Sequence, residues 1–183
     1  MDALKLLALS GSLRRTSYNS AAIRALQLLA APTVKVQIGA IDTLPLFNPD
    51  RENEAIPALV ELKAQISDSH GLVIATPEYA HGISGPMKNA LDWLVSGAEF
   101  PYKPIMLINT SPRAHHAQAA LREVLTTMSG VIIEKASVSI PLLSSRLDAP
   151  GIVADTDMAG ALAIGLAEFC REIRRLRCGQ SEN

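Results

Sequence analysis

Residues 4–19 read LKLLALSGSLRRTSYN, an apolar run followed by a polar loop. The run at residues 4–9 is short and continuous, which is typical of a strand buried on both faces. Ser10, Gly11 and Ser12 end it in a turn. Apolar residues then recur at helical spacing over residues 20–31 and stop at Pro32. The segment therefore predicts a strand, a polar loop and a helix, in that order.

The same alternation continues through the rest of the chain. It predicts further strands at residues 34–38, 71–76, 105–108 and 131–139, and further helices at residues 56–67, 86–95, 116–128 and 157–176. Strands that alternate with helices form parallel sheets covered on both faces, because the crossovers are right-handed. Five strands in 183 residues favour a flavodoxin-like, doubly wound five-stranded α/β sheet of order 2-1-3-4-5, in one domain over residues 1–183. Such sheets bind ligands beyond the carboxyl ends of their strands.

The composition bounds the classes of protein to which the chain can belong. It is 48% hydrophobic and 19% charged, so it can bury a sizeable core, and its net charge of -1 gives no sign of a nucleic-acid or membrane partner. No apolar stretch reaches the ~18 residues of a membrane span, and the first residues lack a signal-peptide pattern. Cys170 and Cys178 would lie about 12 Å apart on one helix, too far for a disulfide. We expect free thiols and a cytoplasmic protein.

Short polar and cationic side chains crowd the loop after the first strand. The positive end of the following helix faces the same place, and such a set of donors suits a phosphate. Neither a Walker motif nor a dinucleotide G-x-G-x-x-G motif is present, so the loop predicts a site for a terminal phosphate monoester. A simple polar turn with a capping Ser or Asn is the alternative. The side chains in question belong to Ser10, Ser12, Arg14, Arg15, Thr16, Ser17 and Asn19.

A second informative loop follows the third strand, where residues 76–93 read TPEYAHGISGPMKNALDW. Pro77 ends the strand, and Pro86 fits the first turn of a helix capped by Gly85 or Ser84. Together with residues 11–19, this segment closely resembles the NADPH-dependent FMN reductase family, which includes small quinone, azo-dye and chromate reductases. Residues 42–48 (DTLPLFN) and the pair at 121–122 also fit, so the resemblance covers nearly the whole chain.

The resemblance implies an enzyme that passes two electrons from NADPH or NADH to FMN, and then to a quinone, flavin, azo or similar acceptor, by a ping-pong mechanism. Because the flavin carries the chemistry, no catalytic side chain is expected. Family members are dimers or tetramers, which implies a homodimer or homotetramer here.

The resemblance also implies roles for individual residues. Pro77, Glu78 and Tyr79 would line the isoalloxazine ring, largely through backbone groups. The FMN phosphate would be held by Ser12, Arg14, Ser17 and Asn19. The other candidate cofactor-binding residues lie in the same loops or after the fourth strand, and are Ser10, Leu13, Ala80, His81 and Ser111. The remaining motif positions are expected to be structural, and are Lys88, Asn89, Asp92 and Trp93.

The chain departs from the family pattern at three places. Ala80 stands where the family usually has Asn, Ser84 where it usually has Pro, and residues 109–116 read NTSPRAHH where a Gly-rich loop is common.

The histidines allow more than one interpretation. His81 either faces the flavin or substrate, or is a solvated loop histidine. Arg113, with His115 and His116, offers a contact for the 2′-phosphate of NADPH. Adjacent histidines on a helix point about 100° apart, and no Cys or carboxylate stands at ligand spacing, so no metal site is expected.

Two other classes of function remain open from the sequence. One is a flavodoxin-like electron carrier, and the other is a cofactor-sensing binding module, both without NAD(P)H turnover. Electron carriers of this fold tend to be strongly acidic, which a net charge of -1 does not match. The intact first loop argues against a module that has lost its cofactor.

Overall fold

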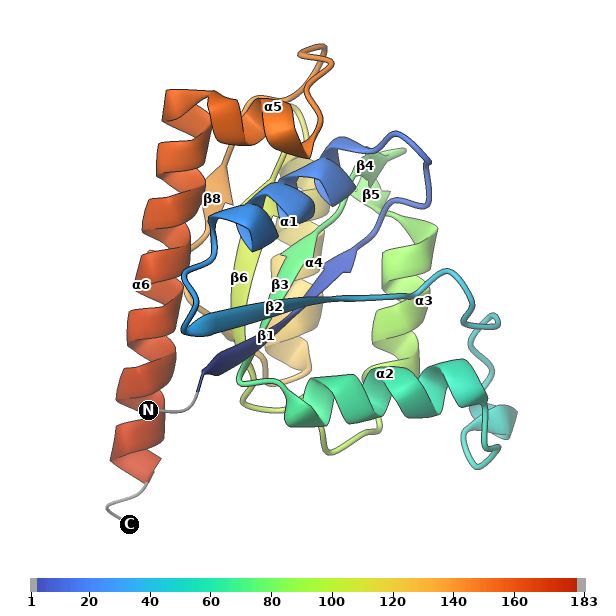
Figure 1. The fold of residues 1–183 in the computed structure, drawn as a ribbon. Coiled ribbons are helices and arrows are strands. Elements are labelled where there is room, and N and C mark those ends of the chain that lie inside the picture. Colours follow the sequence, from blue (N-terminus) through green and yellow to red (C-terminus); the bar gives the residue numbers. More distant parts are fainter. Residues whose placement is uncertain (1–2, 181–183) are drawn as a thin grey trace.

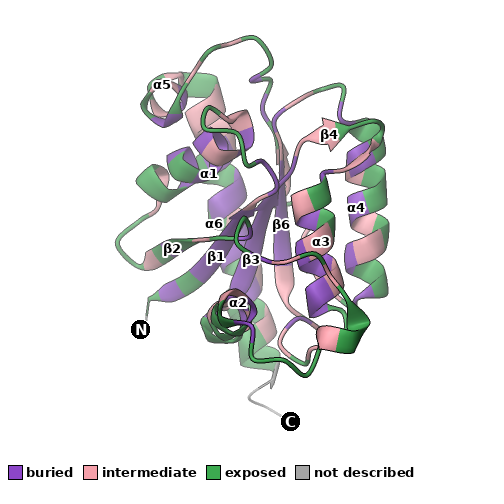
Figure 2. Cartoon of the chain, turned by 90° about the vertical axis from the view of Figure 1, so that its right-hand side faces the viewer, coloured by how far each residue is buried: buried purple, intermediate pink, exposed green. Residues whose placement is uncertain are grey.

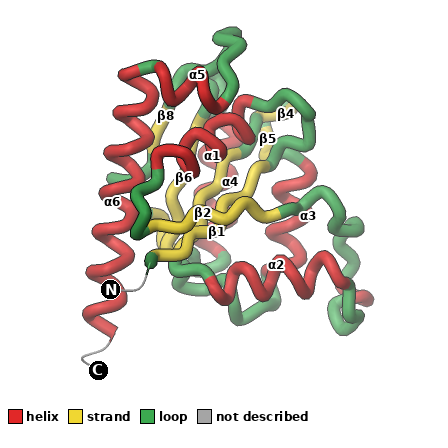
Figure 3. The backbone as a smooth tube through the Cα atoms, viewed as in Figure 1, coloured by secondary structure: helices red, strands yellow, loops and turns green. Residues whose placement is uncertain are grey.

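A parallel sheet lies between two layers of helices in the computed structural model, which describes residues 3–180 (Figures 1 and 3). Its order is β2-β1-β3-β6-β7, with β8 also paired to β6, and every pair is parallel. This is the predicted order 2-1-3-4-5, so the predicted fold class is confirmed. The strands are β1 (Leu4–Ser10), β2 (Val34–Gly39), β3 (Gly71–Ala75), β6 (Pro104–Asn109), β7 (Val131–Ile132) and β8 (Val138–Ser139).

The prediction of one continuous fifth strand over residues 131–139 was wrong. β7 and β8 pair with opposite ends of β6, through Pro104↔Val131 and Ile108↔Val138. Between them the chain turns out of the sheet, and the Ser137 hydroxyl accepts the Leu107 backbone N–H at 3.1 Å. A side chain thus replaces the missing ladder bond, which leaves the buried N–H satisfied.

Alternate residues of the central strands face two separate cores. On β1, Leu6 and Ala8 pack with one helix layer, whereas Leu7 and Leu9 pack with the other. Both faces are apolar because both are covered, and Figure 2 shows buried residues along the middle strands. The first layer holds α1 (Tyr18–Leu29), α5 (Ala149–Ala154) and α6 (Thr156–Gln180), and the second holds α2 (Pro57–Asp68), α3 (Gly85–Leu94) and α4 (His115–Thr127).

Three short elements were not predicted from the sequence. A hairpin of β4 (Glu78–Tyr79) and β5 (Gly82–Ile83) interrupts the loop after β3. A 3₁₀ turn covers Pro49–Arg51, and α5 precedes the last helix. The hairpin and α5 both lie at the end of the sheet where the parallel strands finish (Figure 1).

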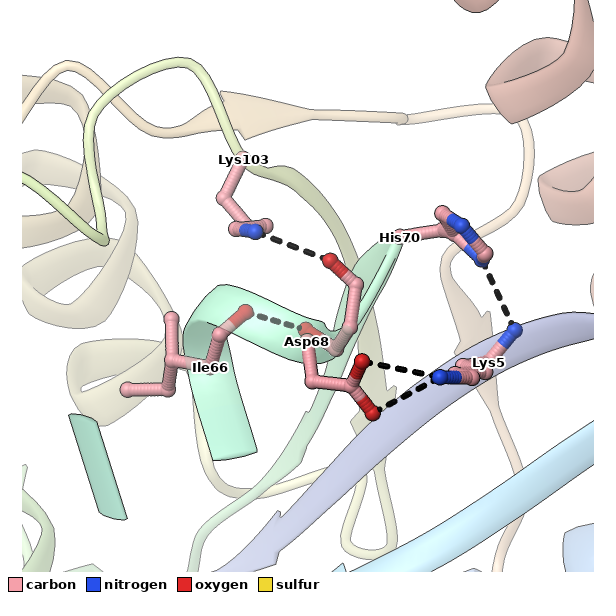
Figure 4. A network of polar contacts seen from close by, with 6 residues as sticks. Lys5, Ile66, Asp68, His70 and Lys103 are labelled. Carbon is pink, nitrogen blue, oxygen red and sulfur yellow. Dashed lines mark hydrogen bonds and ion pairs between the residues drawn. The ribbon is translucent and has the colours of Figure 1, made fainter. Parts of the chain in front are cut away.

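The opposite end of the sheet is closed by a polar network (Figure 4). The Lys5 ammonium donates to both Asp68 carboxylate oxygens, and the Lys5 backbone N–H donates to His70 Nδ1 at 2.9 Å. Lys103 Nζ donates to the Ser69 carbonyl at 2.8 Å. Burial lowers the pKa of both His70 and Lys103. These hydrogen bonds join β1, the end of α2 and the start of β6, so contacts within the protein close this edge of the sheet.

Cys170 is buried and Cys178 exposed, and both are free, as predicted. Among residues 3–180, no helix combines the length and apolar character needed to cross a membrane.

Candidate functional site

The loops after β1 and β3 are joined at Gly11. Its N–H donates to the Ala75 carbonyl at 2.8 Å, and its carbonyl accepts the Ser84 hydroxyl at 2.7 Å. The Ser84 hydroxyl also lies 3.0 Å from the hydroxyl of Thr76. A Cβ on Gly11 would lie 2.2 Å from Thr76 Oγ1, so only glycine allows this approach. The two sequence motifs therefore form one continuous structure.

A cavity of about 900 Å³ opens above this junction, at the carboxyl ends of β1, β3 and β6. Its walls come from the first loop and α1, the start of the β3 loop, the loop after β6, and residues 143–150. This is the edge at which doubly wound sheets bind ligands. Of the predicted cofactor-binding residues it brings together Ser12, Arg14, Ser17, Asn19, Pro77, Glu78, Tyr79 and Ser111.

Four predicted cofactor-binding residues do not line this cavity: Ser10, Leu13, Ala80 and His81. Ser10 is structural, because its hydroxyl lies 2.9 Å from that of Ser20 and accepts the Ser12 N–H. The Leu13 side chain is 54% exposed. The other two occupy the tip of the β4–β5 hairpin.

Helix α1 starts at the end of the first loop, and its first residues line the cavity. Ser17 is the N-cap, and its hydroxyl accepts the Ser20 N–H at 3.3 Å. The amides of Tyr18 and Asn19, in the first helical turn, have no carbonyl within the helix to bond. Asn19 is buried and accepts the Thr110 hydroxyl at 3.1 Å, which ties α1 to the loop after β6. The helix end and this loop therefore form one rigid wall.

The hairpin tip has an unusual backbone. Ala80 and His81 have φ values of 49° and 61°. Two adjacent positive φ angles are the requirement of a type I′ hairpin turn, which favours Asn and Gly. Asn, the usual family residue at position 80, suits this backbone better than Ala. The change from Asn to Ala at position 80 therefore affects the hairpin turn and not a wall of the cavity.

Glu78 connects the hairpin to α4. Its carboxylate accepts the Ala117 N–H at 2.8 Å, within the first turn of α4. That backbone hydrogen bond, aided by the nearby His116, His81 and His115, holds the pKa of Glu78 below its usual value of 4.5. The side chain thus acts as a helix cap, and its backbone is the part left for a ligand.

The three histidines form a ladder outside the main cavity. The rings of His81 and His116 have centroids 4.4 Å apart, and those of His115 and His116 are 4.2 Å apart. His115 lines a separate, smaller cavity beside β6 and β8, whereas Arg113 lines the main one. No group of His, Cys, Asp and Glu in the described part of the chain has an arrangement that could hold a metal ion.

The motif residues on α3 have structural contacts, in agreement with the interpretation of the sequence. Asn89 accepts the Phe47 N–H at 2.8 Å and donates to the Pro45 carbonyl, which also accepts the Trp93 indole N–H. Lys88 and Asp92 form an ion pair. Asn89 and Trp93 therefore fix the loop after β2 against α3, whereas the ion pair lies within the helix.

Sequence reasoning missed the segment at residues 141–148, here called the strap, which precedes α5. Its Leu142 N–H donates to the Thr110 carbonyl, and its Arg146 N–H donates to the Tyr18 hydroxyl at 3.3 Å. Ser144 and Arg146 have φ values of 67° and 59°. The strap follows the fifth strand, so the rule that ligands bind beyond strand ends was the signal that could have found it.

The cavity has more cationic than anionic side chains in its wall, and its arginines form no ion pair within residues 3–180. Among residues 3–180, Arg51, Arg122, Arg171 and Arg175 form ion pairs, but none of the arginines lining the cavity does. The two carboxylates in its wall, Glu78 and Asp148, are engaged by the N–H groups of Ala117 and Gly151. The lining arginines are Arg14, Arg15, Arg24, Arg113 and Arg146.

This donor set fits FMN. Unpaired guanidinium groups and a helix N-terminus suit the phosphate monoester, and the apolar and backbone groups of Pro77 and Tyr79 suit a flat ring.

Known proteins resemble this chain over nearly its full length. The model of the NADPH-dependent FMN reductase family matches residues 4–143. An NAD(P)H-dependent FMN reductase of Pseudomonas aeruginosa is 33% identical over 182 residues, which cover 96% of this chain and 98% of that protein. A quinone reductase of Escherichia coli K12 is 30% identical over 185 residues, again covering 96% and 98%. Among solved structures, FerB, a flavoenzyme NAD(P)H:acceptor oxidoreductase from Paracoccus denitrificans, has a TM-score of 0.84 and 29% identity, covering 94% of this chain and 98% of that one.

Proposed function

This chain belongs to the NADPH-dependent FMN reductase family, and we propose that it holds FMN in the main cavity and reduces quinone-like acceptors with electrons from NAD(P)H. The observation that carries the proposal is the cavity at the carboxyl ends of β1, β3 and β6, where unpaired arginines meet the first turn of α1. A cavity of this charge and position suits a phosphorylated, flat cofactor.

The residues of the chain serve to bind and orient FMN. Arg14 would offset charge of the phosphate monoester, and the hydroxyl of Ser12 and the amides at the start of α1 would donate hydrogen bonds to it. The backbone at residues 77–79 would hold the ring, because Glu78 anchors that segment to α4 through Ala117.

FMN, when bound, accepts two electrons from the nicotinamide and gives them to the acceptor. The protein does not need a general acid or base for this, so no residue is assigned a catalytic role. His81, which the sequence allowed to face the flavin or substrate, lies at the hairpin tip outside the cavity, and this supports leaving it unassigned.

Flat, electrophilic acceptors suit a site with a single open cavity. The relatives named as quinone reductase and 2-hydroxy-1,4-benzoquinone reductase are at least 30% identical to this chain. We therefore propose quinones as the acceptor class, with donor and acceptor using the same space in turn. We also propose a homodimer or homotetramer, as the resemblance implies, which analytical ultracentrifugation measures.

The test is an anaerobic titration of the FMN-loaded protein. NADPH or NADH should bleach the visible flavin band, and benzoquinone should then restore it without oxygen. Initial-rate plots against NADPH at several benzoquinone concentrations should be parallel. If a chemical reductant bleaches the flavin but neither nucleotide does, the chain is an electron carrier and not a reductase.

A further inference from the structure

The main cavity carries more positive charge than one FMN phosphate requires. A phosphate monoester has a charge of about -1.5 to -2 at neutral pH. Arg14 and Arg15, beside the start of α1, already match it. Arg24, Arg113 and Arg146 line the same cavity and add three further guanidinium groups, one more than the two carboxylates in its wall. Like charges gathered in a cleft repel one another and attract an anion.

Two of these extra arginines, Arg24 and Arg146, lie outside the first loop. Tyr18, Ala21 and Arg24 follow one another at three-residue spacing and line the cavity along one side of α1. Six residues of helix place Arg24 about 9 Å along the axis from Tyr18. Opposite this side of α1 stand Arg146, Leu147 and Asp148 of the strap. The cavity therefore has α1 on one side, from Tyr18 to Arg24, and the strap on the other.

The strap is built to hold this position. Leu142 bonds to the Thr110 carbonyl, Arg146 to the Tyr18 hydroxyl, and Asp148 caps α5 through the Gly151 N–H at 2.9 Å. Arg146 keeps a left-handed backbone with a φ of 59°, a conformation that a non-glycine residue adopts at a cost. Asp148 keeps its charge as a cap, but among residues 3–180 it forms no ion pair with Arg146.

We propose that Arg24 and Arg146 form a second phosphate subsite, separate from the FMN phosphate site, and that the phosphates of the nicotinamide dinucleotide occupy it. The proposal rests on the proposed function for the identity of the donor. The shared chemistry is a phosphate held between α1 and the strap. The pyrophosphate of FAD, bound in place of FMN, is the other source of that chemistry.

The experiment compares Arg24→Ala, Arg146→Ala and the double variant with Arg174→Ala, an exposed arginine of α6 that lies outside the cavity. The affinity of the FMN-loaded protein for NADP⁺, read from the perturbed flavin spectrum, should fall about fivefold in each single variant, which corresponds to ~1 kcal/mol. The double variant should lose more than either single variant, with a weaker dependence on salt. The affinity for FMN should be unchanged in all these variants, and Arg174→Ala should keep the wild-type affinity for NADP⁺. Arg146→Lys should keep part of the NADP⁺ affinity.

A second arm measures FMN and FAD binding to the apoprotein of the same variants. If FAD affinity falls while FMN and NADP⁺ affinities hold, the subsite stands and FAD is its source of phosphate. If FMN affinity falls as far as in Arg14→Ala, the arginines serve the first phosphate and the proposal is wrong. The proposal is also wrong if the affinities for NADP⁺ and FAD do not change in these variants. It is wrong as well if Arg113→Ala lowers the affinity for NADP⁺ while Arg24→Ala and Arg146→Ala do not. The measurement of NADP⁺ affinity requires no turnover. If NADPH fails to bleach the flavin of the wild-type protein, the proposed function is wrong, but the affinities of the variants for NADP⁺ can still be compared.

Discussion

Ser84 is fully buried, and it joins the two loops that carry the site. Its hydroxyl bonds the Gly11 carbonyl at 2.7 Å and lies 3.0 Å from Thr76 Oγ1. Ser84→Ala would leave buried polar groups without a partner, so we expect a loss of ~1–3 kcal/mol in the free energy of unfolding, measured by urea denaturation. Ser96→Ala, which removes an exposed hydroxyl at the end of α3, should change it by less than about 0.5 kcal/mol. An equal, small change in both variants would mean that the loops are held by other contacts.

Alanine is an unfavourable residue for the backbone conformation at position 80, because φ there is 49°. A left-handed conformation costs an ordinary residue ~1–2 kcal/mol, and Asn tolerates it better. Ala80→Asn should therefore raise the free energy of unfolding by roughly 0.5–1 kcal/mol. Ala80→Val, which places a β-branched residue at the same turn, should lower it. Thermal and urea denaturation of the two variants check the sign, and a stabilised Val variant would show that the turn adopts another conformation in solution.

At the scale of elements, the hairpin and α4 are coupled through Glu78. Because hydrogen bonding to Ala117 lowers the pKa of Glu78 in the folded protein, the carboxylate stabilises the fold above the unfolded pKa. This contribution is lost as the pH falls from about 4.5 through the lower, folded value. Glu78→Gln should thus be less stable than the wild type at neutral pH, and the difference should shrink below about pH 4.

The matched control is Glu123→Gln, which changes an exposed carboxylate on the same helix. Its stability difference from the wild type should stay small across the pH range. A Glu78→Gln difference that did not depend on pH would contradict the capping role.

The regular elements could be predicted because apolar periodicity determines them. β1, α1, β3 and α3 fall within about two residues of their predicted positions, since their faces are buried in two cores. The β4–β5 hairpin could not be found, because its strands have two residues each and its turn carries Ala and His where Asn and Gly are the usual signals. The broken fifth strand depends on Ser137 bonding to Leu107, a tertiary contact that no local pattern reveals.

At the scale of the whole molecule, the location of the site followed from topology. Parallel strands bring the loops after β1, β3 and β6 to one edge, so residues as distant as Ser12, Pro77 and Ser111 line a single cavity. The strap was missed because its sequence has no phosphate-binding motif. Its Arg146 lies in a loop that only the folded chain brings beside α1.

The cavity's binding of a phosphate monoester is the central claim, and comparing FMN with riboflavin tests it most directly. The two ligands share the ring and differ in the phosphate, so their affinities for the apoprotein, measured by quenching of flavin fluorescence, isolate the first subsite. The wild type should prefer FMN. Arg14→Ala should weaken the binding of FMN by ~1.5–3 kcal/mol, roughly 10- to 150-fold, and leave the affinity for riboflavin unchanged. Equal affinity of the wild type for FMN and riboflavin, or an equal loss of both ligands in Arg14→Ala, would contradict the account.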